Sequence, residues 1–299
     1  MKIKLLPVAL FSILSVANVN AQQIFRLSQY TQHNYLFNPA AAGANEKASI
    51  GVTYKKMWEG IDGGPQTTIL YGDKYFAKQK VGVAAFLYDD KTGPTSRTGG
   101  EVDLSYSVKL DATDKRLMLG LGGQFIQYKI DKAQMLKYIP GDPLLNGPGT
   151  VTTGDASAGV YYNSSTLNLG FSVKQLIQSK LDFIKTKTNT EGRLYRHFYA
   201  MGSYNIRTDE DIVLVPNMMV KFAANAPVDI EGGMRLEYQD LLWVGFNYHY
   251  EQSYSAFAGL KIDHKLAIGY AYDQYKTPLS FFDNGGDAHE ISIRYFFGK

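Results

Sequence analysis

Residues 101–109 read Glu-Val-Asp-Leu-Ser-Tyr-Ser-Val-Lys, with an apolar or aromatic side chain at every second position. Successive side chains of a β-strand point to opposite faces, so this alternation describes a strand with one apolar and one polar face. The same period recurs in residues 167–174 and 228–238. No segment shows the comparable repeat at i, i+3 and i+4 that an amphipathic helix would need. The chain is therefore expected to be built from strands.

About 14 alternating segments follow one another along the chain, each close to the roughly 9–11 residues of a tilted membrane strand. Their expected bounds are 47–55, 66–76, 81–89, 99–109, 116–129, 154–162, 166–174, 195–206, 212–221, 228–238, 241–250, 255–262, 266–273 and 289–297. The composition agrees, because 22 Tyr, 16 Phe and 29 Gly suit many strands and tight turns. A mean hydropathy of -0.21 gives no sign of apolar membrane helices.

The connections between these segments differ in length on the two sides of the expected sheet. If the first strand starts in the periplasm, the periplasmic turns are all short: 77–80, 110–115, 163–165, 207–211, 239–240 and 263–265. The other side receives all the longest connections: 57–65, 90–98, 130–153, 175–194, 222–227, 251–254 and 274–288. Short periplasmic turns with long outer loops are typical of outer-membrane barrels. We therefore predict an all-β fold, a transmembrane antiparallel up-and-down β-barrel of about 14 strands over residues 46–299, in the cell outer membrane.

The N-terminal segment predicts export. Lys2 and Lys4 form a basic region, residues 5–16 are apolar, and residues 19–21 offer a cleavage site for signal peptidase. The apolar run is too short to cross about 30 Å of hydrocarbon as a helix, so residues 1–21 are interpreted as a signal peptide. Residues 22–45 lack alternation and contain a turn at Asn38-Pro39. This short N-terminal extension is expected to be either a periplasmic stub or a plug in the lumen.

Charge and cysteine content exclude several classes of protein. The chain has 31 basic and 28 acidic residues, and removal of Lys2 and Lys4 leaves 29 against 28. Since nucleic-acid binding needs a clustered basic face, no nucleic-acid partner is expected. The chain has no cysteine, which excludes disulfides, thiolate zinc sites, a cysteine nucleophile and an N-terminal lipid anchor.

Aromatic residues near the expected strand ends are candidates for the interfacial girdles of a membrane barrel. They are Tyr54, Tyr88, Tyr128, Tyr248, Tyr250 and Tyr272. The last expected strand alternates and closes with aromatics at residues 295–297, followed by Gly298 and Lys299. Terminal strands that end in Phe are typical of proteins inserted into the bacterial outer membrane.

No arrangement of residues predicts catalysis or a cofactor. The five His form no helical i, i+4 pair, and no G-x-S-x-G motif is present, although His249 lies on a polar strand face near several Ser. Residues 89–93 and 282–287 lack EF-hand spacing and are interpreted as turns rather than calcium sites. The glycines of residues 120–123 are interpreted as part of a curved strand, because no helix follows them. We expect no enzyme activity, no catalytic residue, no cofactor and no metal.

Four motifs stand out from the alternating background. Gln29-Tyr30 is followed by residues 37–43, Phe-Asn-Pro-Ala-Ala-Ala-Gly; residues 54–67 read Tyr-Lys-Lys-Met-Trp-Glu-Gly-Ile-Asp-Gly-Gly-Pro-Gln-Thr; the others are residues 90–95 and 289–296. Together they resemble the PorP/SprF family, membrane proteins of the type IX secretion system of Bacteroidota, with Ala41 where the family usually has an aromatic. The motif residues singled out are Phe37, Asn38, Pro39, Gly43, Trp58, Gly60, Asp62, Gly63 and Pro65. Turn chemistry alone is an alternative reason for Asn38-Pro39 and for residues 60–63.

The resemblance implies a role that composition does not reveal. Members of the family assist export or surface retention of cargo proteins that carry a C-terminal sorting domain and include gliding adhesins. The implied partners are therefore type IX secretion components and cargo sorting domains. A passive outer-membrane pore or small-molecule transporter is the alternative, and a peptidoglycan-linked scaffold is a third hypothesis. Against a pore, the expected lumen mixes charges that should pair. These are Asp229, Glu231 and Glu237 with Lys221, Arg235 and Lys261.

The two longest outer loops, residues 130–153 and 175–194, are the candidate partner-binding surfaces. Leu144 and Leu145 follow two prolines in the first loop, and Phe183 and Ile184 lie between lysines in the second. Apolar side chains in loops suit a surface that a partner covers, and proline lowers the ordering cost of binding. The alternative is that both loops fold over the barrel mouth and bury these residues themselves.

Overall fold

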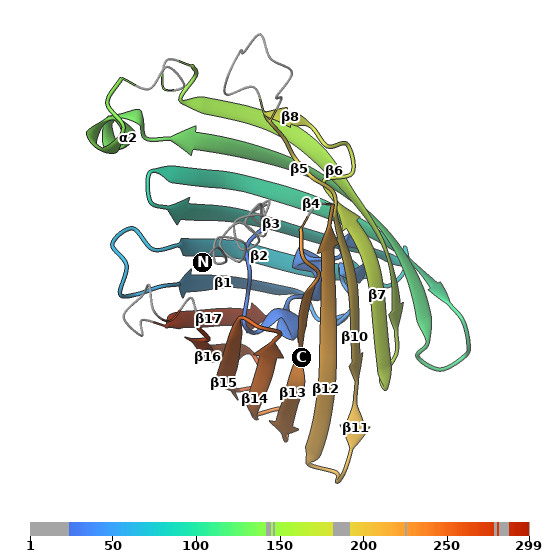
Figure 1. Ribbon diagram of the computed structural model, residues 1–299. Helices are drawn as coiled ribbons and strands as arrows, with labels where there is room; N and C mark the ends of the chain where they lie inside the picture. Colours follow the sequence, from blue (N-terminus) through green and yellow to red (C-terminus); the bar gives the residue numbers. More distant parts are fainter. Residues whose placement is uncertain are drawn as a thin grey trace, which may run out of the picture.

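The computed structural model describes residues 24–141, 145, 147–181, 192–224, 226–277, 280 and 287–298. Strands form a single wall around a lumen (Figure 1). The 14 long strands are β1 (Ser49–Lys56), β2 (Gln66–Phe76), β3 (Val81–Thr92), β4 (Thr95–Lys109), β5 (Arg116–Ile130), β6 (Thr150–Asn163), β7 (Leu167–Lys174), β10 (His197–Tyr204), β12 (Ile212–Ala223), β13 (Asp229–Tyr238), β14 (Leu242–His249), β15 (Ser253–Ile262), β16 (Leu266–Tyr275) and β17 (Ala288–Phe296). Short strands β8 (Lys180–Leu181), β9 (Gly192–Arg193) and β11 (Ile206–Arg207), and the helix α2 (Lys132–Tyr138), lie in connections.

The sheet is antiparallel and closes on itself. Each long strand pairs with its neighbours in sequence, β10 pairs with β12, and β1 pairs with β17 from Ser49↔Phe296 to Lys56↔His289. The predicted up-and-down barrel of 14 strands is therefore confirmed. Among the helices of the described residues, none has the length and apolar character needed to cross a membrane.

The two faces of the wall have opposite character. On β4, Val102 and Leu104 are each 56% exposed on the outside, whereas the inward Glu101 and Asp103 are 3% and 0% exposed. Along their middle parts the other strands follow the same rule, with apolar side chains such as Leu87, Leu121 and Val244 exposed. Apolar side chains outside and polar side chains inside are the arrangement that a lipid environment requires of a barrel.

The two ends of the barrel differ as the loop lengths predicted. We name the end that carries residues 77–80, 110–115, 164–166, 239–241 and 263–265 the short-turn end, and the opposite end, with residues 57–65, 131–149 and 175–196, the long-loop end. One expected loop is much shorter than predicted, because β3 and β4 run on to a tight turn at Gly93 and Pro94.

Strands β4, β5 and β6 are longer than the rest of the wall. β4 and β5 have 15 residues each, whereas β1 and β7 have 8. At about 3.3 Å per residue this difference adds roughly 20 Å of strand. The extra length lies at the long-loop end, where it carries α2, and it stands out in Figure 1. The sequence did not predict α2, although Asp131 caps its first turn by accepting a hydrogen bond from Gln134 N.

Two of the six tyrosines predicted for girdles are placed differently. Tyr54 and Tyr250 are exposed on the outside, whereas Tyr88 faces the lumen and is buried. Tyr128 is on the same face of β5 as the buried Ile126, so it too points inward. The prediction was wrong for Tyr88 and Tyr128, because a position near a strand end does not determine which face of the sheet the side chain points to.

Candidate functional site

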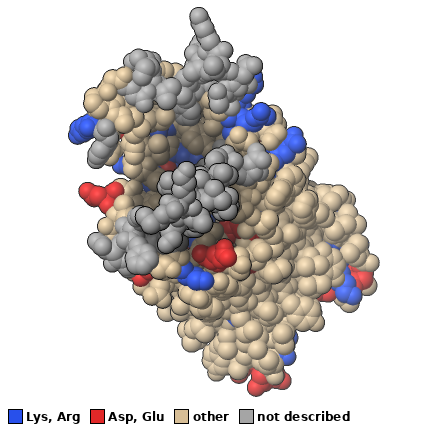
Figure 2. Space-filling model, viewed as in Figure 1, with Lys and Arg blue, Asp and Glu red and all other residues tan. Residues whose placement is uncertain are grey.

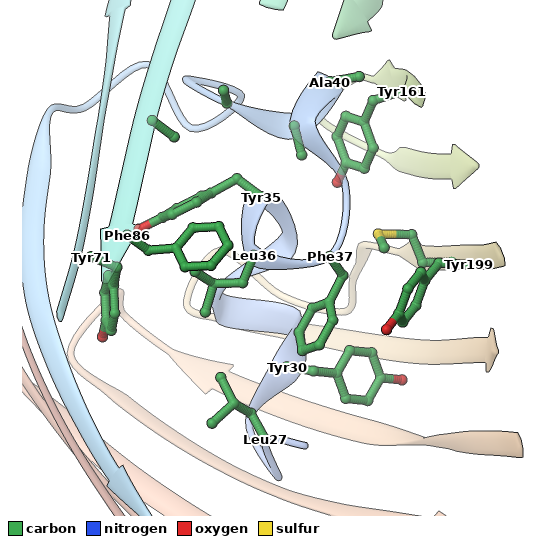
Figure 3. Packing of buried hydrophobic residues seen from close by; sticks show 14 of the residues in the cluster. Leu27, Tyr30, Tyr35, Leu36, Phe37, Ala40, Tyr71, Phe86, Tyr161 and Tyr199 are labelled. Carbon is green, nitrogen blue, oxygen red and sulfur yellow. The ribbon is translucent and has the colours of Figure 1, made fainter. Parts of the chain in front are cut away.

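Residues 24–45, which we name the plug, lie inside the barrel (Figure 1). They contain three single-turn 3₁₀ helices, η1 (Tyr30–Gln32), η2 (Asn34–Leu36) and η3 (Pro39–Ala41). Figure 3 shows their side chains packed against aromatic residues of the wall, and most of the large ones are almost fully buried. The cluster includes Leu27, Tyr30, Tyr35, Leu36, Phe37 and Ala40 from the plug and Tyr71, Phe86, Tyr161 and Tyr199 from the wall. The hydrophobic core of this barrel is therefore its lumen.

The plug runs along the length of the lumen. Phe25 packs on Tyr88 with ring centroids 5.3 Å apart, toward the long-loop end of β3. At the other end of the plug, Arg116 Nη2, from the first residue of β5, donates to Ala44 O over 3.0 Å. The chain thus descends from the long-loop end to the short-turn end before it enters β1.

A cluster of buried charges fixes the plug at Ser28. Lys55 Nζ donates to Ser28 Oγ over 2.6 Å and to Asp273 Oδ2 over 2.7 Å. The Glu290 carboxylate accepts from the backbone N–H of Ser28 at 2.6 Å and of Gln29 at 3.2 Å. Removing one partner from such a buried set leaves an uncompensated charge, so these strands and the plug stabilise one another.

The motif at residues 37–43 binds the opposite wall. Asn38 Oδ1 accepts from Ala40 N at 3.0 Å, which caps η3, while Asn38 Nδ2 donates to Val160 O on β6 at 3.0 Å. Ser172 Oγ on β7 donates to Phe37 O over 2.7 Å. One asparagine therefore serves both the local turn and the contact between the plug and the wall.

Glycines of the wall make room for the plug. A Cβ added at Gly82 would lie 1.9 Å from Ala42 O, one at Gly120 would lie 2.2 Å from Ala40 N, and one at Gly159 would lie 2.1 Å from Asn38 Oδ1. The sequence had indicated only a curved strand at residues 120–123. The signal that could have revealed this role is the motif at residues 39–43. A run of small residues allows close backbone packing, and such packing needs glycines or other small residues on the facing strands.

Several other charged side chains of the lumen form ion pairs. Lys174 lies 2.7 Å from Glu101, Lys221 lies 2.9 Å from Asp229, and Arg294 lies 3.1 Å from Asp73. Voids beside the plug are small, about 10 Å³ next to Tyr30 and about 20 Å³ next to Phe25. A larger cavity of about 270 Å³ opens below Arg235 and Trp243 at the short-turn end. Of the mixed charges predicted for the lumen, Lys221 pairs with Asp229, Arg235 with Glu237 and Glu231 with Arg26 of the plug.

The other three motifs meet at the long-loop end, on what we name the rim, residues 57–65, 93, 287 and 289. In the β1–β2 loop, Met57 N donates to Pro65 O at 2.8 Å and Ile61 N donates to Trp58 O at 2.9 Å. Gly93 N donates to Gly63 O at 2.8 Å, which ties this loop to the β3–β4 turn. His289 Nε2 lies 3.1 Å from Glu59 Oε2, which ties it to β17. Trp58, Gly60, Asp62, Gly63 and Pro65 all lie in this loop, and Gly60, Asp62 and Gly63 are exposed.

The candidate loop residues are only partly described. Leu145 is half-buried, and Leu144, Phe183 and Ile184 lie outside the described residues. The loop before Phe183 is anchored by Asp155, which accepts from Ile177 N at 2.9 Å and Ser179 N at 3.0 Å. Their role as a partner surface stays a prediction.

No group of three or more potential metal ligands occurs among the residues that the structure describes. Asp90, in the first candidate calcium segment, has protein partners for both oxygens, Thr67 Oγ1 at 2.6 Å and Arg97 Nη2 at 3.0 Å. Residues 282–286 of the second segment lie outside the described part. His249 Nε2 is hydrogen-bonded to Asp229.

Comparison with known proteins decides the family. The family model described as type IX secretion system membrane protein PorP/SprF matches residues 19–295. The chain belongs to this family. The comparison with curated proteins found no match.

Solved structures support the same fold. The outer membrane protein Omp33 of Acinetobacter baumannii aligns with a TM-score of 0.50 and 8% identity over 84% of this chain and 98% of that chain. A Pseudomonas aeruginosa FadL homologue aligns with a TM-score of 0.50 and 13% identity over 87% of this chain and 93% of that chain. At these identities the likeness shows the fold alone. This PorP/SprF protein is thus an outer-membrane β-barrel of type IX secretion, and its lack of enzymatic activity stays a prediction.

Proposed function

We propose that this barrel is a cargo-specific accessory of type IX secretion, which assists export or surface attachment of particular proteins such as gliding adhesins. The observation that carries the proposal is the division of the family motifs between a plug that fills the lumen and a rim at the long-loop end. Because the plug occupies the lumen, binding of a partner at the barrel mouth is favoured over transport of a substrate through the barrel. Rigid scaffolds commonly present binding surfaces on their loops, and the rim is such a surface.

The proposal includes the processing and orientation of the chain. Residues 1–21 are removed as a signal peptide, residues 22–45 are the N-terminal extension that supplies the plug, and residues 46–299 form the barrel. The short-turn end faces the periplasm and the long-loop end faces the cell surface, as in other outer-membrane barrels. Partners at the surface are then cargo sorting domains and other secretion components.

Deletion of the gene tests the function directly. Surface proteomes of the deletion strain should lose one adhesin or a few, while other type IX cargo stays at its normal level. Expression of the intact protein in the same strain should restore the missing proteins. Unchanged surface proteomes would remove the basis of the proposal.

Substitution of the outer loops tests where cargo docks. Changing Leu144, Leu145, Phe183 and Ile184 to Ser should abolish cargo retention and leave the heat-modifiable mobility of the barrel intact. Normal display by the variant means that these loops are not the docking surface. Loss of the folded barrel means instead that the loops cover its mouth.

A passive pore is the competing function, and conductance discriminates between the two. The paired lumen charges and the plug predict that the purified protein stays closed in planar bilayers. A large, stable open state in the wild-type protein would favour the pore.

A further inference from the structure

A groove of about 880 Å³ lies on the outside of the wall, across strands β1–β5, and we name it the outer groove. Its volume is within the range of about 300–1,000 Å³ that is usual for sites of small ligands. The outward side chains that line it are apolar, with the exception of Lys74. Because this face of the barrel contacts lipid, the occupant of the outer groove must be apolar over most of its length.

The groove exists because two small residues lie side by side on the outer face of the wall. Gly72 of β2 pairs with Ala85 of β3, and we name these two residues the groove floor. The next outward pair toward the long-loop end is Leu70 with Leu87, which are 48% and 53% exposed. The register therefore places a ridge of leucine side chains directly beside a floor that has none beyond Cβ.

The same ridge continues across β4 onto β5. A Cβ added at Gly100 of β4 would lie 2.6 Å from Leu87 Cδ2 and 2.9 Å from Phe125 Cε1. The side chains of Leu87 and Phe125 therefore reach over β4 from both sides. The outer groove is thus bounded along its long-loop side by packed apolar side chains.

Three lysines lie where the groove approaches the short-turn end. Lys74 lines the groove, and Lys78 and Lys80 follow in the β2–β3 turn; all three are exposed, and we name them the lysine cluster. Lys74 Nζ lies 4.9 Å from the centre of the Phe76 ring, one outward position closer to the turn. A lysine in this position keeps its aliphatic stem on apolar surface and its ammonium group at the boundary with water.

The charged side chains of the molecule mark the same boundary elsewhere. Figure 2 shows a broad stretch of wall without charged side chains, with Lys, Arg, Asp and Glu toward its ends. The lysine cluster therefore lies at the depth where the headgroups of lipids meet the hydrocarbon. Basic side chains at this depth attract anionic headgroups.

The lysine cluster is not neutralised by the protein. Within the residues that the structure describes, none of its members forms an ion pair with a carboxylate, whereas Lys115 in the β4–β5 turn lies 3.3 Å from Asp111. Asp73, the neighbour of Lys74 in sequence, is buried in the lumen and lies 3.1 Å from Arg294. The positive charge of the cluster is therefore available to a ligand.

We infer that the outer groove binds one anionic phospholipid, with an acyl chain along the groove floor and the phosphate at the lysine cluster. Such a lipid matches both parts of the site, because it is apolar along its chain and negatively charged at its headgroup. A second copy of the chain fits less well. It would bring its own lysine cluster to the same depth, where like charges repel, and the apolar lining offers it no side-chain hydrogen bonds.

The choice between two lipids tests the charge of the site in the wild-type protein, without any variant. The purified full-length barrel, stripped of lipid in detergent, is titrated with phosphatidylglycerol and followed by native mass spectrometry. We expect one tight adduct per barrel. Phosphatidylcholine with the same acyl chains has no net charge and should bind at least tenfold more weakly. Equal affinity for the two lipids overturns the inference.

The lysine cluster is tested by changing its three members together to Gln. Each lysine near a membrane surface contributes roughly fivefold to the binding of an anionic lipid, so the triple variant should bind phosphatidylglycerol about tenfold more weakly or worse. The control changes Lys109 and Lys115, at the neighbouring turn, to Gln and should bind within about twofold of wild type. Equal binding by the triple variant and wild type overturns the lysine cluster as the headgroup site.

The groove floor is tested by Ala85→Leu, which places a larger side chain where the acyl chain would lie. We expect this variant to bind phosphatidylglycerol about fivefold more weakly or worse. Ala258→Leu is the matched control, because Ala258 is exposed on the outer face of β15, away from the groove. Both variants should keep the heat-modifiable mobility of the folded barrel. Unchanged binding by Ala85→Leu means that only a phosphate group is held, and a pair of barrels that Ala85→Leu separates identifies a second copy as the occupant. Either result overturns the lipid site.

Discussion

The two halves of the family signature lie in opposite environments. Residues 37–43 are buried in the lumen, where Asn38 and the small residues after it fit against wall glycines. Residues 58–65 form an exposed loop whose main contacts are with other loop-end residues, such as Gly63 with Gly93. A sequence motif therefore need not mark one site. Here the first half secures the plug and the second half shapes the surface above it, so changes in the two halves should affect different measurements.

The largest effect is expected from Gly120→Leu. A Cβ at this position already lies 2.2 Å from Ala40 N, so the larger side chain must displace the plug. Overpacking of this kind costs about 1–3 kcal/mol or more. Planar-bilayer recordings should show open channels for the variant and closed wild-type protein. Gly123→Leu is the matched control, because a Cβ there meets no heavy atom within 4 Å. If both variants stay closed, the plug does not seal the barrel.

Asn38→Ala should have the next largest effect. It removes the cap of η3 and leaves the half-buried Val160 O without its side-chain donor. We expect the free energy of unfolding in micelles, measured with urea, to fall by about 1–3 kcal/mol. Asp62→Ala, in the exposed half of the signature, should change it by less than about 0.5 kcal/mol. Equal destabilisation by the two variants would contradict the division of the signature.

Gly63→Ala should act on display rather than on stability. Gly63 has a φ of 79° and a Cβ there would lie 3.2 Å from Gly93 Cα, so alanine strains the loop and loosens its contact with the β3–β4 turn. Surface display of cargo should fall by about half or more, with conductance unchanged. Gly141→Ala carries the same strain, at a φ of 82°, with no neighbour within 4 Å. A matching loss in both variants would mean that strain alone, and not the rim contact, is responsible.

The smallest expected effect is in a turn at the short-turn end. The Thr113 hydroxyl and the backbone N–H groups of Thr113 and Lys115 donate to Asp111. These bonds, the hydroxyl first, lower the pKa of Asp111 to about 2. Because the folded pKa is depressed, the stabilisation is complete above the unfolded value of about 3.9 and is lost as the pH falls through 2. NMR titration of the carboxyl carbon in micelles measures it, and Thr113→Val should raise the pKa toward its ordinary value. A wild-type pKa near 3.9 would show that the turn does not hold this geometry.

Most of the barrel could be predicted because membrane strands alternate strictly. The segment at 101–109 decided the period, and the expected bounds of β2 and β5 agree with the structure to within a residue at each end. The start of β6 was missed because Thr150–Thr153 stands above the lipid, where no apolar face is required and the alternation disappears. The extensions of β3 and β4 were not predicted for the same reason.

The site was less predictable than the wall. The rim and plug motifs were visible in the sequence. Residues 24–45 show no hydrophobic periodicity, however, because single 3₁₀ turns are shaped by their contacts with the wall and have no regular repeat. The wall glycines were visible too, yet their role depends on contacts with plug residues that lie 40 to 121 positions earlier in the sequence. Tyr88 shows the same limit, since its partner Phe25 lies in a segment without strand register.

The plug has a consequence for the order in which the protein is assembled. Glu290, in the last strand, binds the backbone of Ser28, 262 residues earlier, and Asn38 binds β6 from 122 residues away. Contacts of such long sequence separation form late, because the loops between them must close first. The N-terminal segment therefore finds its full set of partners only after β17 has paired with β1. A fully bound plug is therefore a property of the completed barrel. In a barrel that lacks its final strand, the N-terminal segment lacks its contacts with β17 and is accessible to proteases in the cell envelope.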